Sequence, residues 1–303
     1  MNIMIVVLGE VLFDIFPDGM VIGGAPFNFA YHLKKLGFPV QFVSRIGRDS
    51  MGQNILDFIL SHGFDPDDIQ KDDDHETGTV QVQVTDNGHV FHITPDAAWD
   101  HLEFNGKVAE LILNEPDVLY FGSLIQRTPN GGHFFKQLAG FNLGHTDVFC
   151  DINLRKNAYS RETVQSSMAL CDILKLNLDE LDKTSIPVNK TNGNFPKKPI
   201  HHLMHSHNIK EVILTMGSMG SLWADKNDLS YFGAMVPKPF VDSVGAGDAY
   251  AAVAVAGRLE GLPVNKTMAL ASRFSSYICS IKGALPPGDS TIYTTLKKEI
   301  EAG

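Results

Sequence analysis

Short apolar runs alternate with amphipathic helical patterns along most of the chain, and this alternation constrains the fold more than any other feature. The apolar runs are I-M-I-V-V-L, V-Q-F-V, D-V-L-Y-F-G, D-V-F-C-D-I-N, D-I-L-K-L-N and E-V-I-L-T-M-G. Between the first two runs, Pro26 stands near the start of a predicted helix and Gly37 at its end, and the next predicted helix ends at Gly63. Strands that alternate with helices predict an α/β fold in which helical crossovers cover a parallel sheet.

Two segments interrupt this rhythm with patterns typical of antiparallel hairpins. In residues 77–94, valines alternate with glutamines, and Asn87-Gly88 is a strong signal for a two-residue turn. Residues 11–22 carry a second possible hairpin around Asp18-Gly19, and hinge-capable Gly23-Gly24 follows at once. Together the two hairpins predict a small sheet that serves as a lid. The expected division of the chain is a lid of residues 11–24 and 77–96, and a core of residues 1–10, 25–76 and 97–303.

Composition and charge exclude several classes of function. The formal net charge is -10 at pH 7, and the chain lacks the basic stripe that nucleic-acid binding requires. The first residues have no basic region and reach Glu10 too early for a signal peptide or a membrane span. Cys150, Cys171 and Cys279 are too widely spaced to indicate a disulfide framework or a Cys-x-x-Cys metal site. We therefore expect a cytoplasmic protein with small-molecule partners, and neither nucleic acid nor membrane.

The stretch V-D-S-V-G-A-G-D-A-Y runs directly into an alanine-rich helical pattern. Gly245, Ala246 and Gly247 would leave backbone N–H groups unpaired at a helix N-terminus, which is a favourable place for an anion. Asp248 in the same turn would repel a bound phosphate unless the site also needs a proton acceptor. A base beside an oxyanion site suits the transfer of a phosphoryl group to a hydroxyl, and a capped helix without chemistry is the alternative.

The common nucleotide motifs are missing from the sequence. It contains no Gly-x-x-x-x-Gly-Lys-Ser/Thr, and no Gly-x-Gly-x-x-Gly follows the first strand, which disfavours a dinucleotide-dependent oxidoreductase. Other motifs occur in order over nearly the whole chain: G-G-A-P-F-N-F-A-Y-H-L-K-K-L-G, V-S-R-I-G-R-D-S-M-G, K-L-N-L-D-E-L, T-M-G-S-M-G, D-S-V-G-A-G-D-A-Y and K-G-A-L-P-P. With these motifs the chain resembles the PfkB (ribokinase-like) family of carbohydrate kinases.

The resemblance implies a fold and a set of ligands. The fold is a three-layer α/β/α core with a mostly parallel sheet and a small β-sheet lid. The ligands are a sugar, ATP, Mg²⁺ and often a stimulating monovalent cation such as K⁺. Some members form homodimers through the lid, but the connection from Asp14 to Gly23 is unusually short here, so a homodimer stays an open alternative.

The same resemblance implies roles for residues that contact the sugar and the transferred group. Asp248 would deprotonate the acceptor hydroxyl, and the backbone of Gly245, Ala246 and Gly247 would stabilise charge on the phosphoryl group. The positions that would bind the sugar hydroxyls are Asp14, Gly24 and Asn28.

Further positions resemble the family's nucleotide and ion sites. Asn177 and Glu180 resemble the pair that orders Mg²⁺ through water, although Asn-x-x-Glu alone would indicate only a loop or a helix start. Thr215 and Gly217 resemble positions that line the nucleotide phosphates, where glycine allows close backbone approach. Asp242 resembles a ligand of the monovalent cation.

The segment D-I-N-L-R-K-N-A-Y bears on which sugar accepts the phosphoryl group. It resembles a strand end of fructokinases and 2-keto-3-deoxygluconate kinases. Arg155 could hold the carboxylate of a sugar acid, or donate to hydroxyls and the phosphate. Phe91 on the returning lid strand favours a neutral sugar, because an apolar ring packs on its carbon face. We therefore expect fructose as the acceptor. The alternatives are a 2-keto-3-deoxygluconate kinase, another PfkB sugar or nucleoside kinase, or a catalytically silent sugar-binding protein.

The histidine cluster H-H-L-M-H-S-H at residues 201–207 is a possible metal site. His201 and His205 are four residues apart and could share a helix face, but no carboxylate or cysteine is patterned beside them. The sequence favours an exposed helix at this position.

Overall fold

The computed structural model describes residues 3–85, 88–184, 196–287 and 290–303, and it leaves the side chains of residues 83–91 undescribed. Within these residues, nine strands form the main sheet. Their spatial order is β13 (Leu229–Phe232), β12 (Ser221–Asp225), β11 (Glu211–Thr215), β10 (Ile173–Asn177), β9 (Asp147–Asp151), β8 (Val118–Gly122), β1 (Ile5–Leu8), β4 (Val40–Gly47) and β5 (Ile69–Asp72).

The pairing of these strands explains why the apolar runs are continuous. β1 lies between β4 and β8 and is parallel to both, so that Val7 pairs with Phe42 and with Tyr120. All six predicted strands are joined in this parallel part of the sheet. Among the strands that the structure describes in this sheet, the antiparallel pairings are those of β12 with β11 and with β13.

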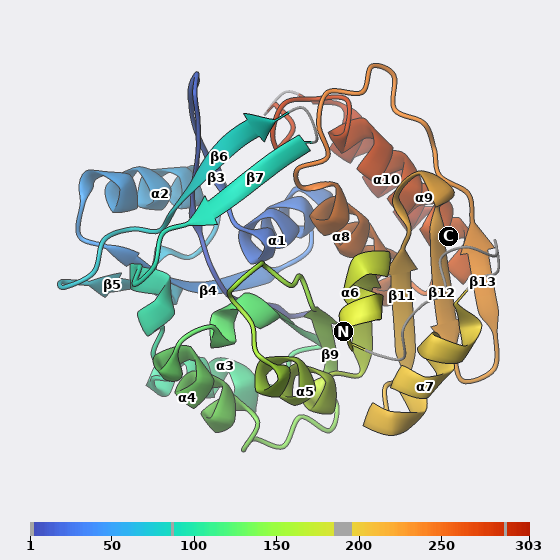
Figure 1. Cartoon of the computed structure of the whole chain (residues 1–303), viewed down its shortest axis with the longest axis horizontal. Helices are drawn as coiled ribbons and strands as arrows, with labels where there is room; N and C mark the ends of the chain where they lie inside the picture. Colours follow the sequence, from blue (N-terminus) through green and yellow to red (C-terminus); the bar gives the residue numbers. More distant parts are fainter. Residues whose placement is uncertain (1–2, 86–87, 185–195, 288–289) are drawn as a thin grey trace.

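Helices cover both faces of the main sheet, which gives the expected three layers (Figure 1). Side chains of β1 alternate between two hydrophobic clusters, with Ile5 and Val7 in one and Val6 and Leu8 in the other. The first cluster includes α1 (Ala25–Leu36), α2 (Ser50–Ser61), α8 (Ala246–Leu259), α9 (Val264–Ile278) and α10 (Ile292–Glu301). The second includes α3 (Gly106–Leu113), α4 (Pro129–Leu138), α5 (Arg161–Leu170), α6 (Leu178–Thr184) and α7 (Lys197–His207).

Short 3₁₀ segments connect several of these elements. They are η1 (Pro66–Asp68), η2 (Ala98–His101), η3 (Ser123–Gln126) and η4 (Gly217–Met219). Among the described residues, no helix combines the length and the apolar character that crossing a bilayer requires.

A second, four-stranded sheet stands apart from the main one, as predicted. It consists of β3 (Gly19–Gly23), β2 (Leu12–Phe16), β6 (Thr79–Thr85) and β7 (Gly88–Ile93). β2 and β3 pair antiparallel, as do β6 and β7, while β2 and β6 join the two hairpins in parallel. The small sheet has its own hydrophobic cluster of Leu12, Phe16, Val80 and Val82, with Ile93 packed against it. The predicted turn at Asn87-Gly88 falls in part on residues 86–87, which lie outside the described residues.

Candidate active site

A cavity of about 730 Å³ lies between the two sheets. The small sheet contributes Leu12, Asp14, Val80 and Ile93 to its wall, and the main sheet contributes residues at the carboxyl ends of its parallel strands. Ligands of open parallel sheets usually bind at this edge, where loops and helix N-termini converge. Most predicted site residues meet here: Asp14, Gly24, Asn28, Arg155, Asn177, Glu180, Thr215, Gly217, Asp242, Gly245, Gly247 and Asp248.

Two further predicted site residues need separate description. Ala246 lines a neighbouring cavity, where its helix α8 begins. The side chain of Phe91 lies outside the described residues, although its backbone pairs with Val82 in the small sheet. The contact of Phe91 with a neutral sugar therefore stays a prediction.

Two helix N-termini face the cavity, and each begins behind a glycine with positive φ. Gly24, before α1, has φ 112°, and a Cβ there would lie 2.5 Å from the carbonyl oxygen of Glu10. Gly245, before α8, has φ 75°, and a Cβ there would lie 2.3 Å from the Cβ of Ala284. Only glycine fits either position without strain, because both the backbone conformation and the space exclude a side chain. The partial positive charge of these helix ends favours an anion.

The predicted base lies in the first turn of α8 and is held by a residue of α1. Asn28 Nδ2 donates to Asp248 Oδ2 at 2.8 Å, and both side chains are buried. Asn28 Oδ1 and Glu10 Oε2 are also buried, and neither has a hydrogen-bond partner among the described residues. Buried polar atoms of this kind nearly always have partners in native proteins. These two therefore mark places where a polar ligand could bind.

Three carboxylates in the cavity have pKa values well above their ordinary range. Burial raises the pKa of Glu10 to about 7, and the pKa of Asp14 and of Asp248 to about 6. The positive charge of Arg155 opposes this effect at all three. Titratable groups perturbed by burial and by one specific charge are characteristic of functional clefts. Arg155 therefore lies where it can balance these carboxylates.

A buried ion pair forms the floor of the cavity beside the start of α8. Lys175 Nζ lies 2.6 Å from Asp151 Oδ2, and both side chains are almost fully buried. Burial would lower the pKa of Lys175, but the Asp151 carboxylate raises it above its ordinary value. No sequence motif predicts a role for Lys175, Asp151 or Glu10. Their positions alone could have indicated a role in the site. Glu10 lies just beyond the end of β1 and Asp151 ends β9, and ligands usually bind at the carboxyl ends of parallel strands.

The Asn-x-x-Glu pair starts a helix, as the motif by itself would indicate. Asn177 Oδ1 accepts from the N–H of Glu180 at 3.0 Å, and Glu180 Oε2 accepts from the N–H of Asn177 at 2.8 Å. This reciprocal arrangement is a capping box at the start of α6. Glu180 Oε1 also accepts from the N–H of Leu154 at 2.8 Å, so the carboxylate fixes the loop that carries Arg155.

Asp242 ties together two loops beside the cavity. Its Oδ1 accepts from the N–H of Val244 at 2.8 Å, and its Oδ2 accepts from the N–H of Gly283 at 3.3 Å. The side chain is buried, which suits an ion ligand as well as a structural brace. The oxygen atoms thus hold the start of the Gly-Ala-Gly turn in place.

A second cavity of about 360 Å³ adjoins the first. The two share Thr215, Gly217, Phe240, Ser243 and Gly247, so they form a continuous path past the start of α8. The wall of the second cavity is largely apolar, with Ala234, Met235, Val236, Pro237, Phe240 and Tyr250. Large exposed apolar side chains gathered in a groove usually mark a ligand site. The pair of cavities therefore offers a polar, carboxylate-rich chamber joined to an apolar slot.

Comparison with known proteins identifies the architecture. The family model described as pfkB family carbohydrate kinase matches residues 13–290. The chain belongs to the PfkB family of carbohydrate kinases. The resemblance inferred from the motifs is therefore confirmed, and the reaction class is transfer of a phosphoryl group to a carbohydrate.

Individual relatives lie at low identity over nearly the full length. The fructokinase of Escherichia coli is 26% identical over 92% of this chain and 94% of its own. The 5-dehydro-2-deoxygluconokinase of Geobacillus thermodenitrificans (strain NG80-2) is 23% identical over 86% of this chain and 78% of its own. The crystal structure of Vibrio cholerae O395 fructokinase with fructose, ADP and calcium ion superposes with a TM-score of 0.77, at 22% identity over 97% of this chain and 99% of that one. Such identities establish the fold of a PfkB kinase but leave its sugar open.

Proposed function

We propose that this PfkB kinase transfers the γ-phosphoryl group of ATP to a hydroxyl of a neutral sugar, with Asp248 as the general base. The observation that carries the proposal is the position of Asp248, which is buried and held by Asn28 one turn into α8. The acceptor hydroxyl would give its proton to this carboxylate as it attacks the phosphorus. A sugar-binding protein without catalysis would have no use for a base beside an anion site.

The start of α8 would stabilise the negative charge that moves during transfer. Gly245, Ala246 and Gly247 present this helix end to the path between the two cavities, although the N–H of Ala246 also makes a long bond of 3.3 Å to Ser243 O. Charge stabilisation by oriented backbone groups suits phosphoryl transfer, in which positioning supplies most of the rate. Thr215 and Gly217 would line the nucleotide phosphates, and the apolar slot would take the adenine ring.

The donor set of the cavity suits a hard divalent cation. Asp151, Asn177 and Glu180 present oxygen atoms near the start of α8, and Mg²⁺ prefers carboxylate, carbonyl and water oxygens. Each oxygen of Glu180 already accepts from one backbone N–H, so the carboxylate would act on the ion through water rather than by direct contact. When bound, Mg²⁺ would neutralise charge on the phosphates. Asp242 would contribute to a K⁺ site that braces the Gly-Ala-Gly turn.

The charges of the chamber favour a neutral acceptor, for which we propose fructose. Arg155 already lies among three carboxylates, Glu10, Asp14 and Asp248, so its charge is not available in full for the carboxylate of a sugar acid. The fructokinase relative supports the same substrate. Asp14, Asn28 and the backbone at Gly24 would bind the hydroxyls. The dehydrodeoxygluconokinase relative keeps a keto-deoxy sugar acid as the second candidate.

The small sheet would act as a lid over the bound sugar. It supplies Leu12, Asp14, Val80 and Ile93 to the cavity wall and has its own hydrophobic cluster, so residues 11–24 and 77–96 could move as one unit. Closure would exclude water and limit wasteful hydrolysis of ATP.

A coupled assay of ATP consumption over a panel of sugars tests this proposal. The panel contains fructose, other neutral hexoses and pentoses, ribosides, 2-keto-3-deoxygluconate and 5-dehydro-2-deoxygluconate. We expect the highest kcat/KM for fructose. A higher kcat/KM for either acid would overturn the choice of sugar and leave the kinase assignment intact. No turnover with any member, combined with measurable sugar binding, would favour the silent binding protein.

A further inference from the structure

Two histidines and an aspartate converge outside the catalytic cavity. His75 Nε2 lies 3.9 Å from Asp96 Oδ1, and His101 Nε2 lies 2.8 Å from the same oxygen. The three ligand atoms all lie within 4.8 Å of one another, and the two imidazole rings are stacked with centroids 3.4 Å apart. Zinc sites with bonds of about 2.0–2.1 Å place tetrahedral ligand atoms roughly 3.3 Å apart, which is close to the present separations. The rings are nearly parallel, so one imidazole must rotate out of the stack before both nitrogen lone pairs point at one ion.

The surroundings of His75 are those of a metal-binding histidine. Its Nδ1 lies 3.0 Å from Asp72 Oδ1, so the ring donates there and turns Nε2 toward Asp96. The carboxylate of Asp72 is fixed in turn by Arg45 Nε at 2.6 Å and by the backbone N–H of Asp74 at 2.9 Å. Metal-ligating histidines almost always donate their second ring nitrogen to a carboxylate or carbonyl held in this way. Asp72 is therefore already placed as the outer partner that a metal-bound His75 would need.

His101 has a comparable partner and the site has access from solvent. The side-chain amide of Asn130 lies 2.9 Å from His101 Nδ1, and rotation of that amide would offer its oxygen as the acceptor that a metal-bound imidazole needs. His75 and His101 also line a cavity of about 510 Å³, and Asp96 is largely exposed. An incoming ion would have an open path and could keep water as a fourth ligand.

The three residues lie at the connections between the β6–β7 hairpin and the core. His75 lies on the connection from β5 to β6, Asp96 lies on the connection from β7 to η2, and His101 ends η2 in the core. An ion held by all three would tie both connections of the β6–β7 hairpin to one point. Asp96 has a left-handed backbone, φ 55°, and its Oδ1 lies near Nε2 of both rings.

We propose that His75, Asp96 and His101 form a Zn²⁺ site that clamps the two connections between the small sheet and the core. Imidazole and carboxylate ligands in a tetrahedral arrangement with one open position suit Zn²⁺. The site is separate from the catalytic cavity and does not depend on which sugar is phosphorylated.

The binding test uses the full-length chain, stripped of metal and titrated with Zn²⁺ against a chromophoric chelator. We expect one saturable site per chain, and a visible absorption band typical of four-coordinate Co²⁺ when Co²⁺ replaces Zn²⁺. Asp96→Asn and His101→Gln should each weaken Zn²⁺ binding by roughly 100-fold or more, because even the loss of an outer partner costs 10- to 100-fold. Asp96 is exposed, so its variant should fold normally.

The matched control is the double variant His201→Ala/His205→Ala on the exposed face of α7, which should bind Zn²⁺ as tightly as the unmodified chain. Absence of one-to-one binding, retention of it in Asp96→Asn and His101→Gln, or its loss in the α7 control would overturn the proposal.

The clamp itself is tested by hydrogen exchange. Zn²⁺ should slow exchange of the amides in residues 73–78 and 94–97 in the unmodified chain and leave them unchanged in Asp96→Asn. Unaltered exchange at both connections in the Zn²⁺-bound chain would overturn the clamp.

Discussion

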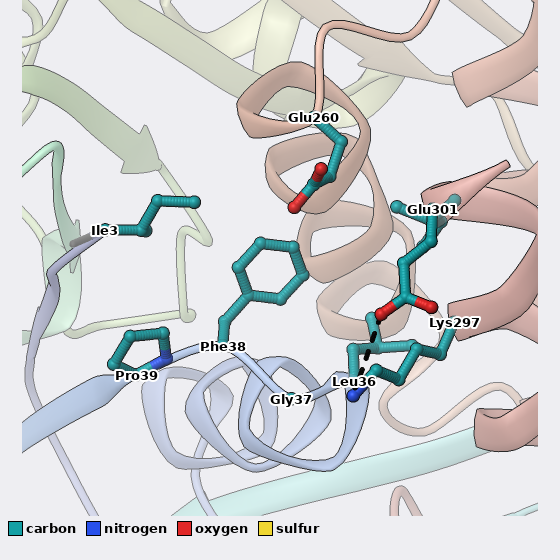
Figure 2. A pocket seen from close by; sticks show the side chains of 9 residues that line it. Ile3, Leu36, Gly37, Phe38, Pro39, Glu260, Lys297 and Glu301 are labelled. Carbon is teal, nitrogen blue, oxygen red and sulfur yellow. Dashed lines mark ion pairs between the residues drawn. The ribbon is translucent and has the colours of Figure 1, made fainter. Parts of the chain in front are cut away.

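Helices α1 and α8 each run from the catalytic cavity to another cavity at the opposite edge of the sheet. We call this one the second hollow; it is distinct from the apolar cavity beside the start of α8, and its charged groups differ from those of the catalytic cavity. Figure 2 shows this second hollow, a cavity of about 430 Å³. It is lined by Ile3, Leu36, Gly37, Phe38, Pro39, Glu260, Lys297, Ile300 and Glu301. Gly37 follows the last residue of α1, and Glu260 follows the last residue of α8. The same helices thus present N-termini to one cavity and C-termini to the other.

The charged groups at the two ends of these helices differ in burial. In the second hollow, Lys297 and Glu301 form an exposed ion pair at 3.8 Å, one turn apart on α10. Exposed ion pairs contribute little to the stability of the fold. In the catalytic cavity, Asp248, Asn28 and the ion pair of Lys175 with Asp151 are buried and linked to helix starts. Burial makes a charge sensitive to its neighbours, and a helix N-terminus attracts anions. A hollow of useful size is therefore not enough, because chemistry needs buried titratable groups at the helix N-termini.

The largest expected effect comes from neutralising the base. Asp248→Asn should lower kcat by roughly 10²- to 10⁴-fold, the usual contribution of a positioned general base, and leave the KM for sugar within a few-fold. Steady-state kinetics with saturating ATP measures this. Glu260→Gln, at the other end of α8, is the control and should keep its turnover. Near-normal turnover of Asp248→Asn would contradict the difference drawn between the two ends.

A smaller effect, on stability, is expected when the glycines at the two ends of α8 are replaced by alanine. Gly245→Ala places a Cβ against Ala284 at φ 75°, whereas Gly261→Ala, at φ 69°, meets no atom within 4 Å. Both changes carry the backbone strain of a positive φ, about 1–3 kcal/mol, but only Gly245→Ala adds a clash. We expect urea unfolding to give a clearly larger loss of stability for Gly245→Ala. Equal losses would mean that the turn before α8 is not tightly packed.

The parallel core was predictable from the sequence because its strands are buried on both faces. Runs such as I-M-I-V-V-L are continuous for this reason, and the valine–glutamine alternation of β6 equally shows a sheet with one covered face. The two edge strands, β5 and β13, and β12 beside β13 were not predicted. Their sequences I-Q-K-D, S-L-W-A-D and L-S-Y-F are short and mix apolar with polar residues.

Site residues with a motif were predictable, and those defined only by three-dimensional neighbours were not. Asp248 and Asn28 lie in recognisable motifs, and the structure adds that they contact each other. Glu10 became a candidate only when its burial and its unpartnered oxygen were known. Lys175 lies inside an apolar strand, and nothing in the sequence shows that its partner is Asp151 on the next strand.

The pH dependence of kcat/KM distinguishes Asp248 from its neighbours. Its pKa is raised to about 6 mainly by burial, and the base must be ionised, so activity should fall as pH drops through about 6. Asn28 donates to this carboxylate and lowers its pKa. Asn28→Ala should therefore move the acid limb to higher pH, and Asn114→Ala, at the end of α3, should not. If the fall of kcat/KM at low pH stayed at the same pH in Asn28→Ala, the titrating group would be one other than Asp248.

The smallest effect is expected at the second hollow. Lys297→Ala removes one partner of an exposed ion pair, so it should leave kcat and KM unchanged and shift the free energy of unfolding by less than about 0.5 kcal/mol. Kinetics and urea unfolding measure both quantities. A marked loss of activity would give this end of the helices a role that its charges do not explain.

A crystal structure of the complex with fructose and ADP would test the central claim most directly. We expect one fructose hydroxyl to lie within about 2.6–3.2 Å of the Asp248 carboxylate and to face the phosphate side of the α8 N-terminus. We also expect the ADP phosphates to lie beside Gly245, Ala246 and Gly247. Sugar bound away from Asp248, or phosphates bound away from the start of α8, would contradict this claim.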